Sequence, residues 1–351
     1  MNPFYLSLLK LTVLSFFSFI IFLYYLSDFL QSSSKKYDPI QKIHKGFVPP
    51  IGGFLIISSF FIYMYLWKPS SFILDAHILI PALFIFFIAF LEDFYLNIKP
   101  SIRFLVIFIG SLLYVLNAEK LPTIDIILIN NFFNQFQFIE IIFYALGLTA
   151  LANGVNMVDG MNGLAGMVLL SIILGICSLL LINDIFTPNY NSELISLGLL
   201  ICIFLIFNFP FGKVFLGDSG AYTIGWITGV MIIEIFSLNT IPSWGAVLLI
   251  SYPILEVIFS TIRKLVQKKN PLKPDLDHIH LKLYYKLKGK DNRSNEFNSF
   301  TTLCLMPLWF LPSTMIVWVH FYSHLSWIAL IIIIFIYFYF YLVTPKANIS
   351  N

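Results

Sequence analysis

The sequence predicts an all-α integral membrane protein, and three observations lead to this fold class. Of the 351 residues, 59% are hydrophobic and only 11% are charged, and the mean hydropathy is +0.87. A soluble domain carries about 25% charged residues, so this chain could not cover a water-facing surface. The apolar residues also form runs long enough to cross a bilayer, which takes about 20 residues in a helix. We therefore expect a single polytopic membrane domain over residues 1–351.

Eleven apolar runs are candidates for membrane-spanning helices. They cover roughly 4–29, 50–67, 74–91, 102–117, 136–151, 163–183, 194–211, 220–237, 243–261, 300–320 and 325–343. The first run is too long for a signal-peptide core of about 7–15 residues and lacks a small-residue cleavage site, so it is expected to be a true span. Polar residues crowd the start of the fifth run, so ten spans are the alternative. No internal repeat is visible.

The loop charges predict the orientation. With eleven spans and the N-terminus outside, 18 of the 21 Lys and Arg residues lie in loops on the inner side. Cytoplasmic loops carry this excess of positive charge in membrane proteins. Ten of the 18 belong to residues 262–299, which is expected to be a basic cytoplasmic loop too short to form a soluble core.

Several kinds of chemistry lack support in the sequence. Cys177, Cys202 and Cys304 are scattered through apolar runs and form neither a metal-binding nor a disulfide spacing. The sequence also lacks a P-loop, an HExxH motif and a serine–histidine–acid constellation, so ordinary ATP hydrolysis is not indicated.

Five polar segments interrupt the apolar pattern, all on the predicted cytoplasmic face. They are HKGFVPPIGG (44–53), LEDF (91–94), NGVNMVDGMNG (153–163), GKVFLGDSG (212–220) and PDLDHIH (274–280). Taken singly, each has an ordinary explanation as a turn, a solvated helix end, a helix cap or part of a basic loop. Because the outer loops contain nothing comparable, the five together predict one site that opens to the cytoplasm.

The residue types in these segments suit phosphate chemistry. Glu92, Asp93, Asp159 and Asp218 offer carboxylates, and Mg²⁺ usually bridges one or two carboxylates to substrate phosphates. Glycines beside Asn and Asp let backbone N–H groups approach phosphate oxygens, and helix N-termini favour anions. The pattern predicts Mg²⁺-assisted phosphoryl transfer at a membrane surface.

The motifs resemble those of the polyprenyl-phosphate N-acetylhexosamine-1-phosphate transferases, the WecA/TagO/MraY group of integral membrane enzymes. Residues 153–164 resemble the family's N-x-x-N-x-x-D-G-x-[DN]-G-L, and residues 208–220 resemble its N-x-P…F-x-G-D-[ST]-G. Residues 253–256, followed by Arg263 and Lys264, resemble its P-x-x-[DE] span with a basic end. His44 to Gly53 resembles its first cytoplasmic loop. The resemblance runs from about residue 44 to residue 282.

The resemblance implies an enzyme that moves an N-acetylhexosamine 1-phosphate from a UDP-sugar to undecaprenyl phosphate and releases UMP. The lipid-linked product would initiate a cell-envelope polysaccharide, for example a lipopolysaccharide O-antigen. It also implies a bacterial inner membrane as the location. A homodimer is left open, and no nucleic acid is expected as a partner. The sequence does not identify the sugar.

The resemblance assigns roles by position. Asp218 is the first candidate Mg²⁺ ligand and Asn156 the second, with Mn²⁺ as an alternative metal. Asp93, Glu92 and Asp159 are the candidate catalytic residues. The residues expected to bind the substrates are Asn153, Asn156, Asn162, His278, His280, Lys99, Arg103, His44 and Arg263. We expect direct attack by the lipid phosphate on the β-phosphorus, with a two-step route through a carboxylate phosphoester as the alternative.

Three positions depart from the usual family pattern. Glu92 stands where an Asp is usual, and Asn162 stands where a second acid is common, so a hydrogen-bonding role is expected there. Leu281 follows the H-x-H pair in place of a further His, which argues against the MraY branch and its muramyl-pentapeptide substrate. That branch remains one alternative function. A membrane transporter with polar residues in broken helices is the other.

Overall fold

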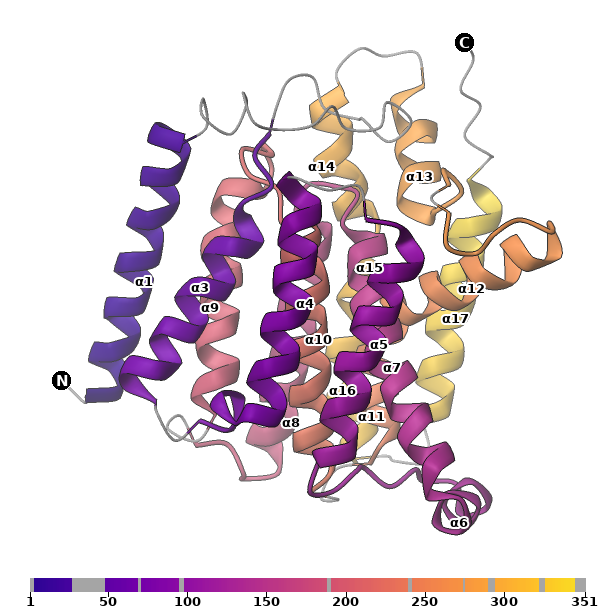
Figure 1. Ribbon diagram of the computed structural model, residues 1–351. Coiled ribbons are helices and arrows are strands. Elements are labelled where there is room, and N and C mark those ends of the chain that lie inside the picture. The colour runs from indigo at the N-terminus through magenta and orange to yellow at the C-terminus, as the bar shows by residue number, and fades with distance from the viewer. Residues whose placement is uncertain are drawn as a thin grey trace.

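The computed structural model describes residues 3–26, 48–68, 71–94, 98–187, 191–238, 242–273, 275–289, 294–321 and 326–344. The regular structure of these residues is helical, and they contain no strand (Figure 1). Within this described part of the chain, seven helices are long and apolar enough to cross a membrane. The fold class predicted from the sequence, an all-α integral membrane protein, is therefore confirmed.

The elements follow one another in chain order with short connections. The first half contains α1 (Pro3–Ile21), the π-helical η1 (Phe22–Leu26), α3 (Gly52–Trp67), the 3₁₀ turn η2 (Phe72–Leu74), α4 (Ala76–Phe94), α5 (Pro100–Asn117), α6 (Ile127–Gln135) and α7 (Gln137–Val158). The second half contains α8 (Leu164–Ile182), α9 (Ser192–Asn208), α10 (Gly217–Phe236), α11 (Trp244–Leu249), α12 (Ser251–Val266), α13 (Ile279–Lys288), α14 (Ser294–Cys304), α15 (Met306–Trp309), α16 (Leu311–Phe321) and α17 (Ser326–Val343).

Each of the eleven apolar runs forms a helix or a series of short helices. Two of them, α3 and α9, are apolar but shorter than 18 residues. The ninth run is divided into α11 and α12, and the tenth into α14, α15 and α16. The weak fifth run is a 22-residue helix, α7, and the polar residues before it belong to the separate helix α6. How many of these segments cross the bilayer stays a prediction.

Helix α10 occupies the centre of the bundle. In the membrane-length window of α10, 89% of the residues are buried, against 22% in α1 and in α17. It packs against α7, α4 and α3. Small residues allow these close approaches: a Cβ atom on Gly225 would lie 3.1 Å from Val155 of α7. Close backbone contact through glycine is the usual means of holding helices together inside a membrane.

The polar segments gather at one end of the bundle. In Figure 1, α1 starts at the lower end and α17 finishes at the upper end, where α13 and α14 also lie. The surface helix α6 lies at the opposite, lower end. Successive long helices alternate in direction, so the C-terminal ends of α4 and α7 meet the N-terminal ends of α5 and α10 at the upper end.

Helix α7 extends seven residues beyond the span expected to end at residue 151. Its last turns are polar but remain helical because their polar groups have local partners. The amide Nδ2 of Asn153 donates to the backbone oxygen of Thr149, at 2.8 Å. Gly154 faces α12, where a Cβ atom would lie 2.5 Å from the carbonyl oxygen of Pro253. The first half of NGVNMVDGMNG is therefore helix, and only residues after Val158 form the loop.

Candidate active site

The loop before α3 is paired with the loop before α10. The N–H of Phe215 donates to the oxygen of Pro49 at 3.0 Å, and the N–H groups of Gly52 and Gly53 donate to the oxygens of Phe215 and Leu216 at 2.9 and 2.8 Å. The helix starts then touch directly, because a Cβ atom on Gly53 would lie 2.1 Å from the Cα of Gly220. Two polar segments about 160 residues apart in the sequence thus form one backbone unit.

Asp93, at the C-terminal end of α4, caps the N-terminus of α10. Its Oδ1 accepts the backbone N–H of Asp218 at 2.8 Å, and its Oδ2 accepts that of Ser219 at 3.0 Å. The first N–H groups of a helix lack partners within the helix and favour a negative charge. The dipole of α4 opposes a negative charge at the C-terminal end of that helix. The dipole of α10 favours the same charge at its N-terminus and so offsets this effect. Gly217, with φ +76°, makes the turn beside this carboxylate.

Asp218 forms an ion pair with Arg103 of α5. The guanidinium of Arg103 also lies over the ring of Tyr222, 5.9 Å from its centroid. The hydroxyl of Tyr222 accepts a hydrogen bond from Nδ2 of Asn156 at 2.9 Å. The two expected metal ligands, Asp218 and Asn156, are therefore connected through Arg103 and Tyr222 across three helices.

Asp159 lies directly after α7, close to two other carboxylates. Burial raises its pKa well above the ordinary value, and the charges of Asp218 and Asp93 raise it further. Three acids near one another in a poorly solvated place repel, and a bound cation would relieve that repulsion. Glu92 points toward the connection to α5, where it accepts the N–H of Ile98.

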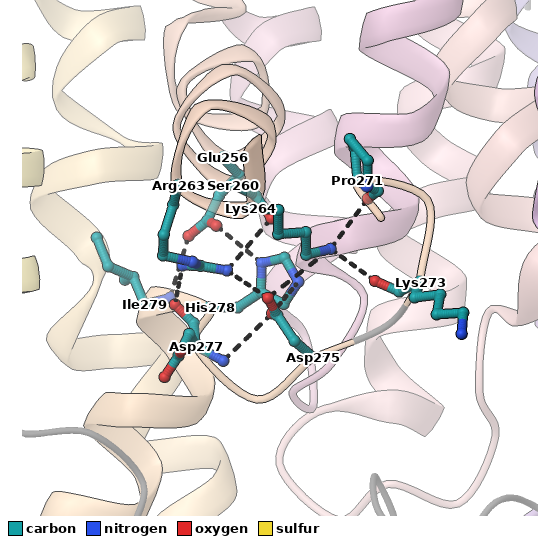
Figure 2. Close-up of polar contacts among 10 residues, drawn as sticks. All are labelled: Glu256, Ser260, Arg263, Lys264, Pro271, Lys273, Asp275, Asp277, His278 and Ile279. Carbon is teal, nitrogen blue, oxygen red and sulfur yellow. Dashed lines mark hydrogen bonds and ion pairs between the residues drawn. The ribbon is translucent and has the colours of Figure 1, made fainter. Parts of the chain in front are cut away.

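The basic loop is held by the part of α12 from Glu256 to Lys264 (Figure 2). Glu256, which is 1% exposed, lies 3.1 Å from Nδ1 of His278 and accepts the N–H of Ile279 at 3.3 Å. Arg263 donates to the carboxylate of Asp275 at 2.7 Å and to the carbonyl oxygen of Asp277 at 2.6 Å. Both outer nitrogens of Arg263 are thus occupied by the protein itself.

The basic loop also meets the loop after α7. His280 is 2% exposed, and a Cβ atom on Gly160 would lie 2.4 Å from its Nε2. The rings of His278 and His280 are nearly parallel, with centroids 5.7 Å apart. Burial lowers the pKa of His280 to about 3, because the charged imidazolium is poorly solvated there. The structure therefore brings the H-x-H pair and the D-G-x-N-G motif together.

Asn162 is buried, and its backbone N–H, its backbone oxygen and its Nδ2 all form hydrogen bonds within the protein. Its Nδ2 donates to the oxygen of Pro210 at 3.0 Å and to Oγ of Ser299 at 3.3 Å. Its backbone N–H donates to Asn298 at 2.6 Å, and its oxygen accepts from Thr302 at 2.8 Å. These contacts join the loop after α7 to α14 and to the N-x-P segment. Substrate binding by Asn162 stays a prediction, and its contacts within the protein are structural.

The other expected substrate-binding residues differ in their surroundings. Lys99 is exposed at the start of α5, and Arg103 is half-buried beside it. Asn153 is bonded to its own helix and Arg263 to the basic loop. His44 lies outside the described residues.

Four contributors to the site were not named individually as site residues, although Asn208 and Asp275 lie in segments that the sequence singled out. Tyr222, Asp275, Asn208 and Asn298 all link segments that carry the motifs. Tyr222 follows Asp218 by four residues, a spacing that places two side chains on one face of a helix, so the sequence did contain a signal for it. No local pattern distinguishes Asn298 from other residues of its helix.

The donor set fits a magnesium ion that keeps most of its water. Among the described residues, no three side chains of His, Cys, Asp or Glu lie close enough together to hold a metal alone. Mg²⁺ commonly binds one or two carboxylates and completes its shell with water and substrate phosphates. Asp218, with Asn156 nearby and the charges of Asp93 and Asp159 within range, provides such a partial shell.

Comparison with known proteins agrees with this site. Residues 76–236 match the family model for glycosyl transferase family 4. This range includes α4, α5, α7 and α10, which carry Asp93, Arg103, Asn156 and Asp218. This part of the chain is similar to that family, and its motifs resemble those of the polyprenyl-phosphate sugar-phosphate transferases.

Relatives from both branches of the family are similar to the chain. The undecaprenyl-phosphate α-N-acetylglucosaminyl 1-phosphate transferase of Thermotoga maritima is 32% identical over 139 residues, 40% of this chain and 41% of that protein. A phospho-N-acetylmuramoyl-pentapeptide-transferase of Wolbachia is 29% identical over 235 residues, 61% of this chain and 70% of that protein. A probable undecaprenyl-phosphate N-acetylglucosaminyl 1-phosphate transferase of Bacillus subtilis is 27% identical over 149 residues, 39% of this chain and 38% of that protein. The matched part thus spans about two fifths of two of these relatives.

Proposed function

We propose that the protein transfers N-acetylglucosamine 1-phosphate from UDP-N-acetylglucosamine to undecaprenyl phosphate and releases UMP. The observation that carries this proposal is the assembly of four separated motifs around Asp218 at one end of the bundle. The Thermotoga and Bacillus relatives act, by name, on an N-acetylglucosaminyl 1-phosphate group and undecaprenyl phosphate. The transferred group and the acceptor are taken from those names, and the UDP-linked donor from the resemblance of the motifs. The product would be the first lipid-linked intermediate of a cell-envelope polysaccharide.

The proposed location is the inner membrane, with the site open to the cytoplasm. The excess of Lys and Arg in the loops that the sequence predicts to be cytoplasmic supports this orientation. The nucleotide sugar would then enter from the cytoplasm, while the polyprenyl chain of the acceptor stays in the bilayer. Lys99 and Arg103, at the start of α5, lie where a phosphate at the membrane surface could approach them.

In this proposal, the site residues bind or orient the metal ion and the nucleotide sugar. Asp218 and Asn156 would hold Mg²⁺, which when bound would neutralise and orient the diphosphate of the donor. Asp93 orients Asp218 through the backbone of α10, and Arg103 balances its charge. The loop after α7, with Asp159 and the buried His280 against Gly160, would line the donor side of the site.

Direct attack is the mechanism that the geometry favours. An oxygen of the lipid phosphate forms a new bond to the β-phosphorus, the bond from that phosphorus to the bridging oxygen breaks, and UMP leaves with the electron pair. A phosphate monoester needs no further activation near neutral pH, so positioning and charge neutralisation would supply most of the rate. In a two-step route a carboxylate would attack first, but both oxygens of Asp93 already accept hydrogen bonds from α10.

The central test is Asp218→Asn. Membranes containing the protein are incubated with labelled UDP-N-acetylglucosamine, undecaprenyl phosphate and Mg²⁺, and the label in the organic phase is measured. We expect a loss of about 100-fold or more, because the substitution removes the charge that would hold the metal. EDTA should abolish the labelled lipid in the unsubstituted protein.

Asp184→Asn is the matched control. Asp184 follows α8 at the opposite end of the bundle and has φ +55°, a conformation that Asn adopts well, so activity should be retained. Full activity of Asp218→Asn would contradict the proposal. So would label that crosses sealed vesicles without forming lipid product, which would instead indicate a transporter.

A further inference from the structure

Helix α12 presents four polar side chains to the basic loop, from its middle to its last turn. Glu256, Ser260, Arg263 and Lys264 are spaced at i, i+4, i+7 and i+8, which places them on one face of the helix. Figure 2 shows this face turned toward Pro271, Lys273 and the residues from Asp275 to Ile279. We call these four side chains and Asp275 the α12 clamp.

The clamp holds the loop along its length. Nζ of Lys264 donates to the carbonyl oxygens of Pro271 and Lys273, at 3.1 and 2.7 Å. Arg263 bonds to Asp275 and Asp277 further along. Burial raises the pKa of Asp275, but the charges of His278, Arg263 and Lys264 together hold this pKa below its ordinary value. The carboxylate of Asp275 therefore stays charged. The start of the loop is thus fixed by charge-assisted hydrogen bonds.

Glu256 fixes the end of the loop, where α13 begins. One carboxylate oxygen faces Nδ1 of His278 and the other accepts the N–H of Ile279. The other ring nitrogen of His278, Nε2, lies 3.5 Å from Asp275. His278 is therefore held between two carboxylates, and the next polar side chain, His280, is carried onto Gly160.

We propose that Glu256 is a positioning residue for the nucleotide-sugar side of the reaction. It acts through His278 and the first turn of α13, which set the H-x-H pair against the loop after α7. The proposal rests on the proposed function for its kinetic readout. It also assigns Arg263 to the clamp rather than to the substrate. The ligand class is the diphosphate of a nucleotide sugar, which imidazole and backbone N–H groups can bind.

The test compares Glu256→Gln with Glu256→Asp. The glutamine can still accept the N–H of Ile279, but its amide N–H₂ cannot accept from His278 as a carboxylate does. We expect the KM for the UDP-sugar to rise about tenfold, since small displacements of positioning groups have large effects. The KM for undecaprenyl phosphate should stay within about twofold, because that substrate approaches at α5. The aspartate variant, which keeps the charge, should recover part of the loss.

Glu193→Gln is the matched control. Glu193 is also a buried glutamate, 5% exposed, and accepts a hydrogen bond from Ser71 at 2.7 Å at the far end of the bundle. It should change neither KM. A merely structural effect of Glu256 would lower the amount of active enzyme and leave both KM values unchanged, which would overturn the proposal. An equal rise in both KM values would overturn it too.

Hydrogen–deuterium exchange provides a second test that does not depend on catalytic activity. In Glu256→Gln, residues 275–285 should exchange faster than in the unsubstituted protein, while Glu193→Gln should leave this segment unchanged. Unchanged exchange in Glu256→Gln would contradict the clamp. If the unsubstituted protein made no lipid product, the proposed function would fail, and the exchange result would still decide whether Glu256 holds the loop.

Discussion

Asn162 stands at a position where the resembling motif carries either an acid or an amide, and its contacts explain the amide. The carbonyl oxygen of Pro210 can only accept a hydrogen bond, so the group that faces it must be a donor. The amide of Asn supplies that donor and a carboxylate would not. The same buried place holds Ser299, whose hydroxyl also donates to Pro210. The departure at this position thus has a structural reason.

Asn162→Asp should therefore destabilise the protein. The substitution places a buried carboxylate against a carbonyl oxygen, which costs about 1–3 kcal/mol for the unsatisfied groups. Thermal unfolding of the detergent-solubilised protein measures the loss. Asn153→Asp, in the same motif but partly exposed, should cost less because water can reach it. Equal stability of Asn162→Asp and the unsubstituted protein would show that the Pro210 contact is unimportant.

At the scale of elements, the contact between α3 and α10 sets the position of Asp218. The two helix starts are joined by three backbone hydrogen bonds and by direct contact of Gly53 with Gly220. Asp93 adds the end of α4 to the same junction. Asp218, the residue proposed to bind the metal, is thus positioned by backbone contacts between elements.

Gly53→Ala tests this junction. The added methyl group would lie 2.1 Å from a backbone atom of α10, which cannot move aside as a flexible side chain could. We expect a stability loss of about 1–3 kcal/mol and a clear loss of transferase activity, because the start of α10 must shift. Gly147→Ala is the control, since nothing lies within 4 Å of its added Cβ atom. Normal activity of Gly53→Ala would disprove the rigid junction.

At the scale of the whole molecule, the site end is held together by loops that bridge distant helices. Asn162 joins the loop after α7 to α14, and the α12 clamp joins the basic loop to the bundle. Lys282 and Lys286 of α13 donate to the backbone oxygens of Tyr341 and Val343, at the end of α17. His280 is buried at this end of the molecule, 2% exposed, so the folded state should be sensitive to protonation there.

Acid should destabilise the protein partly through His280. Its pKa is about 3 in the folded protein against an ordinary value of 6.5, so the unfolded state binds the proton more readily. The stability contribution is complete above about pH 6.5 and is lost as the pH falls toward 3. The nearby charges are Glu256, which opposes the lowering, and His278, which favours it. Unfolding temperature measured from pH 7.5 to 5 should fall less steeply in His280→Gln. Parallel curves for the two proteins would contradict the buried neutral imidazole.

Much of the fold follows from the sequence because the bilayer imposes a local rule. A helix of about 20 apolar residues satisfies its own backbone, so each span can be recognised without knowing its neighbours. All eleven expected runs are helical for this reason. The helix ends were less predictable. The last turns of helix α7 pack against α12 at Gly154, where a Cβ atom would lie 2.5 Å from the carbonyl oxygen of Pro253, and a contact with a helix about 100 residues away is not visible in the local sequence.

The sequence by itself determined the membrane fold, the five polar segments and the kind of chemistry that their residues suit. Only the tertiary structure decided which motif residues gather around Asp218 and which, like Asn162 and Arg263, hold the protein together. It also decided that Asp93 closes the start of α10 and that Glu256 holds His278. Hydropathy and turn residues act over a few neighbours in the chain, whereas these contacts join segments up to about 140 residues apart and depend on how closely the helices pack.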